Sequence, residues 1–306
     1  MSTISSPIGP LGLWVPGIDL RPPTESAALA AEIESLGYGA LWLSEGLVRD
    51  PFLEAATLLN ATSTLVVGTG IAVIWGRHPR SVRAQTRALT DSHPNRFVLG
   101  LGTSHRLVVE DVLGLRYERP LAEMRSHLDR LDAPDPLIDL VGLQHPSAGR
   151  APRVLAALGP KAIALARDRS DGAFSYLVTP EHTAEARAIL GPGSTLLVEQ
   201  AVVAGVDADE ARARARGHIA SYLAARPYRE SWQRLGFTDS DFADGGSDRL
   251  VEALVALGDD AIAERVAAHH AAGADHVCLQ ALPGDFTSAP VDQWRHLAGL
   301  LLPTRV

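Results

Sequence analysis

The sequence predicts an α/β fold. Three observations predict it: short apolar runs typical of buried strands, Ala/Leu-rich helical segments between most of them, and a glycine that recurs where a helix should stop. The apolar runs do not alternate with polar residues, which is typical of strands buried on both faces of a parallel sheet. The repeating unit is clearest in residues 25–45, where Thr24 is the expected N-cap and Gly37 the stop. It returns in residues 261–282, with Gly273 as the stop.

Eight strand candidates follow one another along the 306 residues. They are residues 11–15, the apolar run that ends the 25–45 unit, 65–74, 96–101, 152–157, 171–175, 194–203 and the apolar run that ends the 261–282 unit. Eight βα units in a chain of this length predict a (β/α)8 TIM barrel. A doubly wound open sheet is the alternative, but no G-x-G-x-x-G motif follows the first strand.

Two stretches do not fit the repeat. Residues 133–151 are rich in Pro, Asp and Gly and are expected to connect to the fifth strand. Residues 226–258 are expected to form a helical insertion before the last helix and strand. Because insertions on a barrel commonly cover or frame its site, we expect this one to do so. No linker divides the chain, so we expect one domain over residues 1–306.

Composition narrows the function classes. The net charge of -8 and the lack of a long basic stripe argue against a nucleic-acid surface. The only cysteine, Cys278, lies in an apolar run, so it is expected to be a small buried hydrophobe, and a reducing compartment fits. The first ten residues do not resemble a signal peptide, and no apolar run approaches the roughly 18 residues of a membrane span. We therefore expect a cytoplasmic protein.

The third strand is interrupted by glycines. In "VVGTGIAVIWGRHP", residues 66–79, Gly68 and Gly70 divide a run that otherwise suits a buried strand. Glycine inside a strand usually marks a bulge or a place where another group approaches the backbone closely. The sequence therefore predicts a bulge here, with a close neighbour still to be identified.

Active sites of TIM barrels lie at the carboxyl ends of the strands, so the residues there are the functional candidates. Candidates lie in or directly after the ends of all eight strands, and two of these positions carry clear chemical signals. The candidates are Trp14, Glu45, Trp75, the run Gly102, Thr103, Ser104 and His105, the run Gly159, Pro160 and Lys161, then Tyr176, Glu199, Gln200 and Gln280.

The clearer signal is "LGPKA", in which Gly159 and Pro160 begin a helix and Lys161 adds a positive charge. A helix N-terminus favours an anion, so a phosphate site is one interpretation and an ordinary helix start is the other. The second signal is "GLGTSH", whose glycines allow a sharp turn and whose His105 titrates near neutral pH. His105 could equally be structural, and Glu45 could simply pair with a nearby arginine.

Metal and nucleophile chemistry are not indicated. There is no H-E-x-x-H motif, no H-x-H after the first strand and no G-x-S-x-G elbow. With neither a metal nor a thiol in prospect, the polar groups are best interpreted as holding an organic cofactor that performs the chemistry.

The chain resembles the bacterial luciferase-like superfamily of TIM-barrel flavin enzymes, and most of all its branch that uses the deazaflavin coenzyme F420. The resemblance covers nearly the whole chain. It is carried by "YGALWLSE", "VVGTGIAVIWGRHPRSVRAQTRAL", "NRFVLGLGTSH", "RVLAALGPKAIALARDRSDGAFSYLVTPEHT" and "AGADHVCLQ". The motifs of the third and fourth strands are the most specific. The choice of F420 over FMN rests on overall similarity alone.

The resemblance implies roles for several of these residues. A cis peptide bond at Gly70–Ile71 would support the cofactor ring from behind, the alternative being a bulge with trans geometry. Glu45 would lie by the ring as a second catalytic residue and orient the ring or its hydrogen bonds, and Gly102, Thr103 and Ser104 would run along the cofactor. Gly159, Pro160 and Lys161 would bind its phosphate.

The chain departs from a sugar-phosphate dehydrogenase of the same family at two positions. Gly46 stands where that enzyme has its active-site His, and His105 replaces its catalytic carboxylate. A sugar-phosphate substrate is therefore not carried over, and His105 becomes the expected acid or base.

We therefore predict hydride transfer between F420 and a small organic substrate, with a pocket walled by Trp14, Trp75 and Tyr176. The alternatives are an FMN-dependent monooxygenase and a non-catalytic flavin-binding barrel. A cofactor-free sugar-phosphate enzyme is disfavoured. The family also implies a homodimer, with helices 52–62 and 79–92 as candidate interface elements, although their apolar faces could equally cover the barrel.

Overall fold

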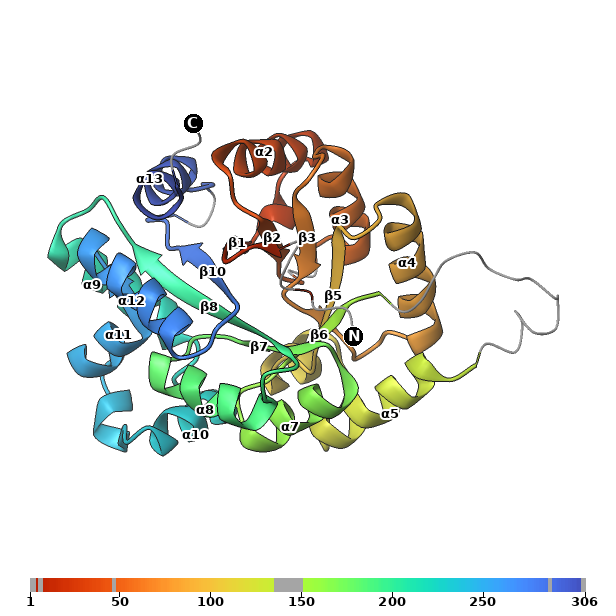
Figure 1. Cartoon of the computed structure of the whole chain (residues 1–306). Coiled ribbons are helices and arrows are strands. Elements are labelled where there is room, and N and C mark those ends of the chain that lie inside the picture. Colours follow the sequence, from red (N-terminus) through yellow and green to blue (C-terminus); the bar gives the residue numbers. More distant parts are fainter. Residues whose placement is uncertain (1–3, 5–7, 46–47, 135–150, 286–287, 304–306) are drawn as a thin grey trace.

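The computed structural model describes residues 4, 8–45, 48–134, 151–285 and 288–303. The strands form one parallel sheet in the order β10-β1-β2-β3-β5-β6-β7-β8, and β8 pairs with β10 to close it. The predicted (β/α)8 barrel is therefore confirmed. The strands line the centre of the molecule and the helices surround them (Figure 1).

The barrel strands match the eight predicted runs. They are β1 (Leu11–Val15), β2 (Ala40–Leu43), β3 (Val66–Thr69), β5 (Phe97–Gly102), β6 (Arg153–Ala156), β7 (Gly172–Ser175), β8 (Thr195–Val203) and β10 (His276–Ala281). Two short strands lie beside this closed set: β4 (Ala72–Val73) pairs with β5, and β9 (Val255–Leu257) pairs with the end of β8.

Helices follow most strands and pack outside the barrel. They are α2 (Pro23–Leu36), α3 (Pro51–Asn60), α4 (Pro79–Ser92), α5 (Pro120–Asp132), α7 (Pro160–Arg169), α8 (Pro180–Leu190), α9 (Ala208–Ala220), α10 (Arg226–Arg234), α11 (Asp248–Leu254), α12 (Asp259–Ala271) and α13 (Val291–Leu301). Short turns of 3-10 or π helix are η1 (Ile18–Leu20), η2 (Val108–Val112) and η3 (Asp239–Phe242).

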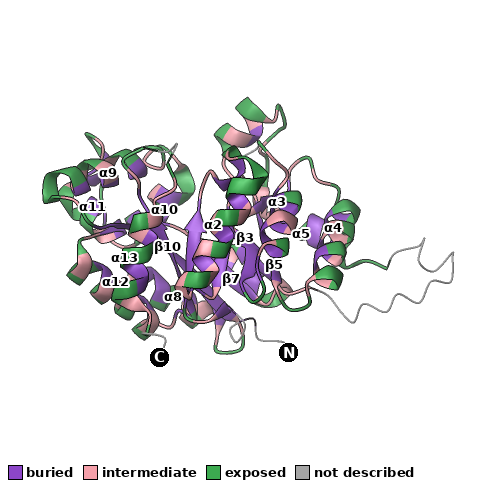
Figure 2. Cartoon of the chain, turned by 90° about the horizontal axis from the view of Figure 1, so that it is seen from above, coloured by how far each residue is buried: buried purple, intermediate pink, exposed green. Residues whose placement is uncertain are grey.

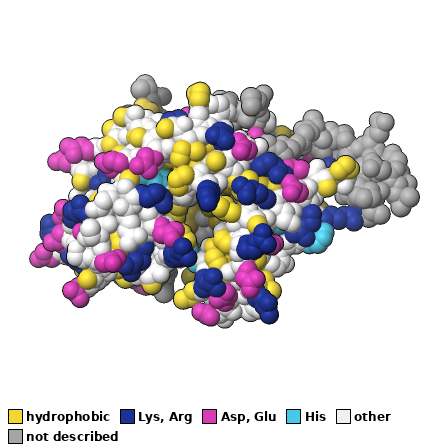
Figure 3. Space-filling view, turned by 90° about the horizontal axis from the view of Figure 1, so that it is seen from below, with side chains coloured by type: hydrophobic (Ala, Val, Ile, Leu, Met, Phe, Trp, Pro, Cys, Tyr) yellow, Lys and Arg dark blue, Asp and Glu magenta, His cyan; other side chains and the backbone are white. Residues whose placement is uncertain are grey.

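Burial is arranged in concentric layers. The strands are buried, whereas the helices present exposed residues to the outside (Figure 2). One apolar cluster fills the barrel and includes Trp42, Phe174 and Cys278, the last buried as expected. A larger cluster lies between the strands and the helices. Seen from below, hydrophobic and basic side chains border a hollow near the middle of the molecule (Figure 3).

The third predicted strand is divided at its second glycine, as the glycine pattern indicates. The Gly70–Ile71 peptide bond is cis, as the resemblance implied. Two tryptophans approach the glycines from inside the barrel. A Cβ on Gly68 would lie 2.2 Å from the Trp42 ring, and one on Gly70 would lie 2.7 Å from Trp14 Nε1. Within the protein itself, the close neighbours of these glycines are therefore indole rings.

Many of the helices begin with a proline, and for one of them this makes the predicted N-cap wrong. Thr24 was predicted to cap the first helix, but α2 begins at Pro23, with Pro22 as its N-cap and no side-chain cap. Proline suits the first helical turn because its φ is already helical and it lacks an N–H group that would be left without a partner. Thr24 therefore lies inside the helix. Gly37 does end α2, with a left-handed φ of 98°.

The stretch 226–258 is mostly helical, with α10, η3 and α11. It also contains β9, which the sequence did not predict. Three β9 residues pair in parallel with Ala201–Val203 at the end of β8, because β8 continues beyond its pairing with β7, which ends at Val198. The predicted connection 133–151 falls mostly on residues 135–150, outside the described part of the chain.

The apolar faces proposed as a dimer interface are largely used within the chain. In α3, Ala55, Leu58 and Leu59 are buried in the cluster between strands and helices, whereas Leu53 is 70% exposed. The homodimer stays a prediction. Within the described ranges, the molecule has no helix with both the length and the apolar character needed to cross a membrane.

Candidate active site at the carboxyl ends of the strands

A small cavity opens at the carboxyl end of the barrel, because all paired strands run parallel and end at the same rim. Its volume is about 150 Å3. It is lined by residues from three strand ends and from α9 and the turn after it. They are Trp14, Pro16, Tyr176, Gly217, His218, Ser221, Tyr222 and Gln280.

Tyr176 is the centre of a neutral hydrogen-bond network in this cavity. Its hydroxyl donates to Gln280 Oε1 at 2.8 Å and accepts from the Tyr222 hydroxyl at 3.2 Å. His218 Nε2 lies 3.4 Å from the same oxygen. Burial raises the pKa of Tyr176 well above its usual range and lowers that of His218 to about 4. At neutral pH the network therefore carries no charge.

Trp14 joins this cavity to the divided third strand. Its ring lies 5.0 Å from that of Tyr176, and its Nε1 donates to the carbonyl oxygen of Gly70 at 2.8 Å. That carbonyl belongs to the cis Gly70–Ile71 bond. The structure thus brings two of the three predicted pocket residues together, next to the predicted cofactor support.

His105 adjoins the same aromatic group from another side. Its ring lies 6.1 Å from that of Tyr222 and 5.6 Å from that of Tyr228. Burial lowers the pKa of His105, so the imidazole is neutral at pH 7. Tyr228 comes from α10 and packs behind the lining residue Tyr222, with ring centroids 4.9 Å apart. That the 226–258 stretch frames the site stays a prediction, because its residues are not among those that line the cavity.

A buried carboxyl group holds the backbone that follows Tyr176. Leu177 has a positive φ of 54°, which is uncommon for a residue other than glycine. Its N–H donates to Glu199 Oε2 at 2.9 Å, and its carbonyl accepts from Trp232 Nε1 at 3.3 Å. Glu199 is fully buried, and burial raises the pKa of its carboxyl to about 8. Glu199 therefore positions Tyr176 through the Leu177 backbone.

The predicted site residue Glu45 takes part in a charged network. Its Oε2 accepts from the Val73 N–H at 2.6 Å, and its Oε1 pairs with Arg77 at 2.7 Å. Arg77 also pairs with Asp50 at 2.7 Å, and Asp50 caps α3 by accepting from the Phe52 and Leu53 N–H groups. Burial lowers the pKa of Arg77, but the hydrogen bonds to its two carboxylates outweigh burial and raise it. One oxygen of Glu45 thus fixes the backbone at Val73, and the other fixes the side chain of Arg77.

The loop after β5 is fixed by two aromatic side chains. Trp75 Nε1 donates to the Thr103 carbonyl at 2.7 Å, and the Tyr117 hydroxyl donates to the Ser104 carbonyl at 3.2 Å. Ser104 itself has a left-handed φ of 53°. A Cβ on Gly102 would lie 2.5 Å from the Ile71 side chain, so this glycine makes room for Ile71.

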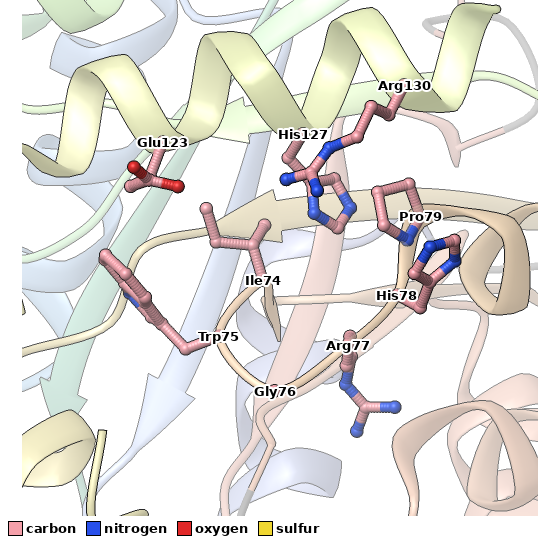
Figure 4. A pocket seen from close by; sticks show the side chains of 9 residues that line it. All are labelled: Ile74, Trp75, Gly76, Arg77, His78, Pro79, Glu123, His127 and Arg130. Atoms are coloured by element: carbon pink, nitrogen blue, oxygen red, sulfur yellow. The ribbon is translucent and has the colours of Figure 1, made fainter. Parts of the chain in front are cut away.

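Trp75 faces a second cavity of about 310 Å3, between the 74–79 loop and α5. Glu123, His127 and Arg130 project from α5 towards this loop (Figure 4). Trp14 and Tyr176 belong to the barrel interior and its edge, whereas Trp75 packs against the outer cluster. The three predicted pocket residues therefore lie in two places.

The predicted phosphate-binding segment is an open helix start. Gly159 is the N-cap of α7, no side chain caps this end, and a Cβ on Gly159 would meet nothing within 4 Å. Pro160 and Lys161 are exposed. The preceding Leu158 carbonyl accepts from His182 Nε2 at 2.8 Å and from Arg234 at 3.0 Å, which fixes the loop.

Six of the eight lining residues were not proposed as pocket residues from the sequence. Gly217, His218, Ser221 and Tyr222 lie on or just after α9, in a segment between two repeat units, whereas Pro16 and Gln280 lie at strand ends. The aromatic and histidine residues between 218 and 228 were the available signal. Over the described parts of the chain, no His, Cys, Asp and Glu cluster is arranged to hold a metal ion.

Comparisons with known proteins agree with this architecture. A Mycobacterium tuberculosis protein named "Putative coenzyme F420-dependent oxidoreductase" is 24% identical over 348 aligned positions, covering 95% of this chain and 97% of that protein. The structure of a coenzyme F420-dependent tetrahydromethanopterin reductase from Methanopyrus kandleri superposes with a TM-score of 0.73 at 14% identity, covering 96% and 99% of the two chains.

A third similar structure contains FMN. It is the oxygenating constituent of 3,6-diketocamphane monooxygenase from Pseudomonas putida, with a TM-score of 0.69 at 16% identity and coverage of 97% and 99%. At these identities the two solved structures show the shared fold. The family model described as luciferase-like monooxygenase matches residues 11–276, which is most of the chain. This chain therefore belongs to the luciferase-like monooxygenase family.

Proposed function

We propose that the protein is an oxidoreductase that transfers a hydride between coenzyme F420 and a small organic substrate. The observation that supports F420 as the cofactor is the match over 95% of the chain to a relative named as F420-dependent. The neutral cavity beside Trp14 and Tyr176, close to the cis Gly70–Ile71 bond, supports a site for an uncharged reactant there. When bound, the deazaflavin supplies a hydride donor or acceptor at C5 of its ring.

The residues present fit such a cofactor. The open, uncapped start of α7 with the exposed Lys161 suits a phosphate group, because helix N-terminal N–H groups and a cation favour an anion. Ile71, Gly102, Thr103 and Ser104 would adjoin the ring, on a backbone that Trp14, Trp75 and Tyr117 hold in place. Glu45 would act from behind, by fixing β4 through the Val73 N–H.

His105 is the proposed acid or base. Its lowered pKa leaves the imidazole neutral at pH 7 and therefore ready to accept a proton. Its contacts with Tyr222 and Tyr228 place it against the aromatic wall of the cavity. Trp14 and Tyr176 would wall the substrate side, whereas the contacts of Trp75 assign it to the support of the Thr103–Ser104 loop.

An FMN-dependent monooxygenase is the second candidate. The FMN-containing monooxygenase that superposes with a TM-score of 0.69 favours it, as does the description of the family. A deazaflavin does not readily activate oxygen, so the identity of the cofactor distinguishes a dehydrogenase or reductase from a monooxygenase.

The test is a pair of titrations on the cofactor-free protein, one with F420 and one with FMN, each followed by quenching of the ligand's fluorescence. We expect F420 to bind at least about tenfold more tightly. Stronger binding of FMN would favour the monooxygenase. Binding of neither would contradict both, and F420 binding without turnover of any substrate would indicate the non-catalytic binding protein.

A further inference from the structure

The side of the cavity that faces α9 has no assigned role. On this side the cavity is lined by Gly217 and His218 of α9 and by Tyr222 just beyond it. On the opposite side it is lined by Tyr176 and Gln280, which belong to the barrel. The sequence did not mark these α9 positions as functional. Their chemistry and spacing nevertheless restrict what the cavity can hold.

The first restriction is charge. None of the side chains that line the cavity is ionised at pH 7, because burial lowers the pKa of His218 to about 4 and raises those of Tyr176 and Tyr222. A charged ligand would lose its hydration here without gaining a counter-charge, which is unfavourable. The cavity therefore selects a neutral molecule.

The second restriction is a hydrogen-bond donor in need of an acceptor. Gln280 is 2% exposed, and its Oε1 accepts from Tyr176. Its amide nitrogen has no hydrogen-bond partner among the residues that the structure describes. This nitrogen is not one of the fully buried polar atoms and Gln280 lines the cavity, so the donor is open to a ligand and an oxygen atom is favoured next to it. A hydroxyl or carbonyl oxygen provides that acceptor.

The third restriction is size. A cavity of about 150 Å3 matches the volume that accommodates one benzene-sized ring. Gly217 contributes to this space, because a Cβ at this position would meet nothing within 4 Å. Gly217 is exposed at the edge of the cavity, so we expect a larger side chain here to extend over the cavity without displacing other residues.

We propose that this cavity is the substrate-specificity pocket, that it takes a neutral molecule with one hydroxyl or carbonyl oxygen on an apolar body no larger than a six-membered ring, and that Gln280 binds the oxygen while Gly217 sets the size limit. This assignment deepens the proposed function and rests on it. Trp14 and Pro16 supply the apolar wall, and Tyr176 orients Gln280.

Cyclohexanone is the probe, and its binding is followed by saturation-transfer NMR at pH 7, with and without F420. We expect the wild type to bind it, and Gly217→Leu to weaken binding at least about tenfold. The matched control is Gly299→Leu, a second glycine within a helix whose Cβ would also meet nothing within 4 Å. It should bind cyclohexanone as the wild type does.

Two further comparisons test the chemistry. Gln280→Met keeps a similar volume without the N–H donor, so it should weaken cyclohexanone binding about fivefold or more. Cyclohexanecarboxylate should bind at least about tenfold more weakly than cyclohexanone, because no cation lines the cavity.

The proposal is overturned if folded wild-type protein does not bind cyclohexanone, if Gly217→Leu binds it equally well, or if the carboxylate binds as tightly. The F420 titration separates this failure from failure of the proposed function. Loss of F420 binding with intact, Gly217-dependent cyclohexanone binding would contradict the cofactor alone. Normal F420 binding with no effect of Gly217→Leu would contradict the pocket alone.

Discussion

Two halves of the barrel rim use polar groups in opposite ways. On one half, the ends of β2 and β4 carry Glu45, Arg77 and Asp50, whose charges satisfy one another and fix the backbone. On the other half, the ends of β1, β7 and β10 carry Trp14, Tyr176 and Gln280, which are neutral and border empty space. We call these the charged half and the neutral half.

The difference shows where a reactant has room. In the charged half both Glu45 oxygens and the two terminal nitrogens of Arg77 face protein partners at 2.6 to 2.7 Å, so they serve as scaffold. In the neutral half an amide nitrogen and a hydroxyl network face a cavity of about 150 Å3. The presence of charged residues is therefore a poor guide to the ligand site here. The charged residues are paired with each other and hold the backbone, whereas the neutral groups remain available to bind a ligand.

The largest expected effect comes from His105, which follows β5 and contacts Tyr222 at the border of the neutral half. His105→Phe keeps a ring against Tyr222 and Tyr228 but removes both nitrogens. We expect kcat/KM of the proposed F420-dependent reaction to fall about 10²- to 10⁴-fold, typical of losing a general acid or base. Because burial lowers the pKa of His105, wild-type kcat/KM should stay level down to below pH 6.5. Steady-state kinetics against pH check both, and an unchanged rate in His105→Phe would remove it from the mechanism.

Breaking the charged half should affect stability more than chemistry. Arg77→Met leaves the Glu45 carboxylate, only 9% exposed in its side chain, without its partner. We expect a loss of about 3 kcal/mol in the free energy of unfolding, measured by urea titration. Arg77→Lys should lose less, about 1 to 2 kcal/mol, because lysine keeps the charge but cannot bridge two carboxylates with one planar group.

The matched control for Arg77 is an ion pair on the outer surface. Arg226 pairs with Glu230, but its side chain is 87% exposed. Arg226→Met should therefore destabilise the protein far less than Arg77→Met, because solvent screens an exposed ion pair. Equal losses in Arg77→Met and Arg226→Met would show that the charged half is not a scaffold.

Glu199 beneath the neutral half should give stability a pH dependence. Its pKa is raised from 4.5 to about 8 in the folded protein, so between these values the folded state binds more protons than the unfolded chain. Stability from this group is thus fully present below the lower value and is lost as pH rises towards 8. Relative to Glu199→Gln, the wild type should lose up to about 1.4 kcal/mol per pH unit in this window.

Urea unfolding of both proteins from roughly pH 5 to 9 measures this difference, which should level off above the folded pKa. Glu199→Gln retains an oxygen that can accept from the Leu177 N–H. Glu199→Leu removes this acceptor, so its free energy of unfolding should fall by a further ~1 to 3 kcal/mol at every pH. Parallel pH curves for wild type and Glu199→Gln would contradict a buried, protonated Glu199.

The smallest effect separates two roles of Asp50. Its side chain caps α3 and also pairs with Arg77. Asp50→Asn keeps a good N-cap but loses the ion pair, so we expect a loss of about 0.5 to 1 kcal/mol. Asp50→Ala loses both and should cost about 2 kcal/mol. If thermal or urea unfolding shows the two variants to be equal, the cap contributes nothing measurable.

The predicted and observed sites differ for local reasons. Trp14 and Tyr176 were predicted because Trp14 lies near the end of β1 and Tyr176 directly follows β7, and parallel strands bring their ends together. Trp75 follows the third strand in the same way, yet the turn after β4 directs it to the Thr103 carbonyl and the other cavity. The position of a residue after a strand indicates that it lies at the rim of the barrel. The direction of its side chain depends on the geometry of the loop, which the periodicity of the sequence does not encode.

By itself, the sequence determined the barrel and most of its element boundaries, because continuous apolar runs and glycine stops are local patterns. It also determined the division of the third strand, since its glycines leave room for Trp42 and Trp14. Only the tertiary structure decided that Glu45 belongs to a closed ion network and that α9 completes a neutral cavity. The physical reason is that pairing of charges and enclosure of space arise between segments far apart in the chain, where sequence spacing carries no distance information.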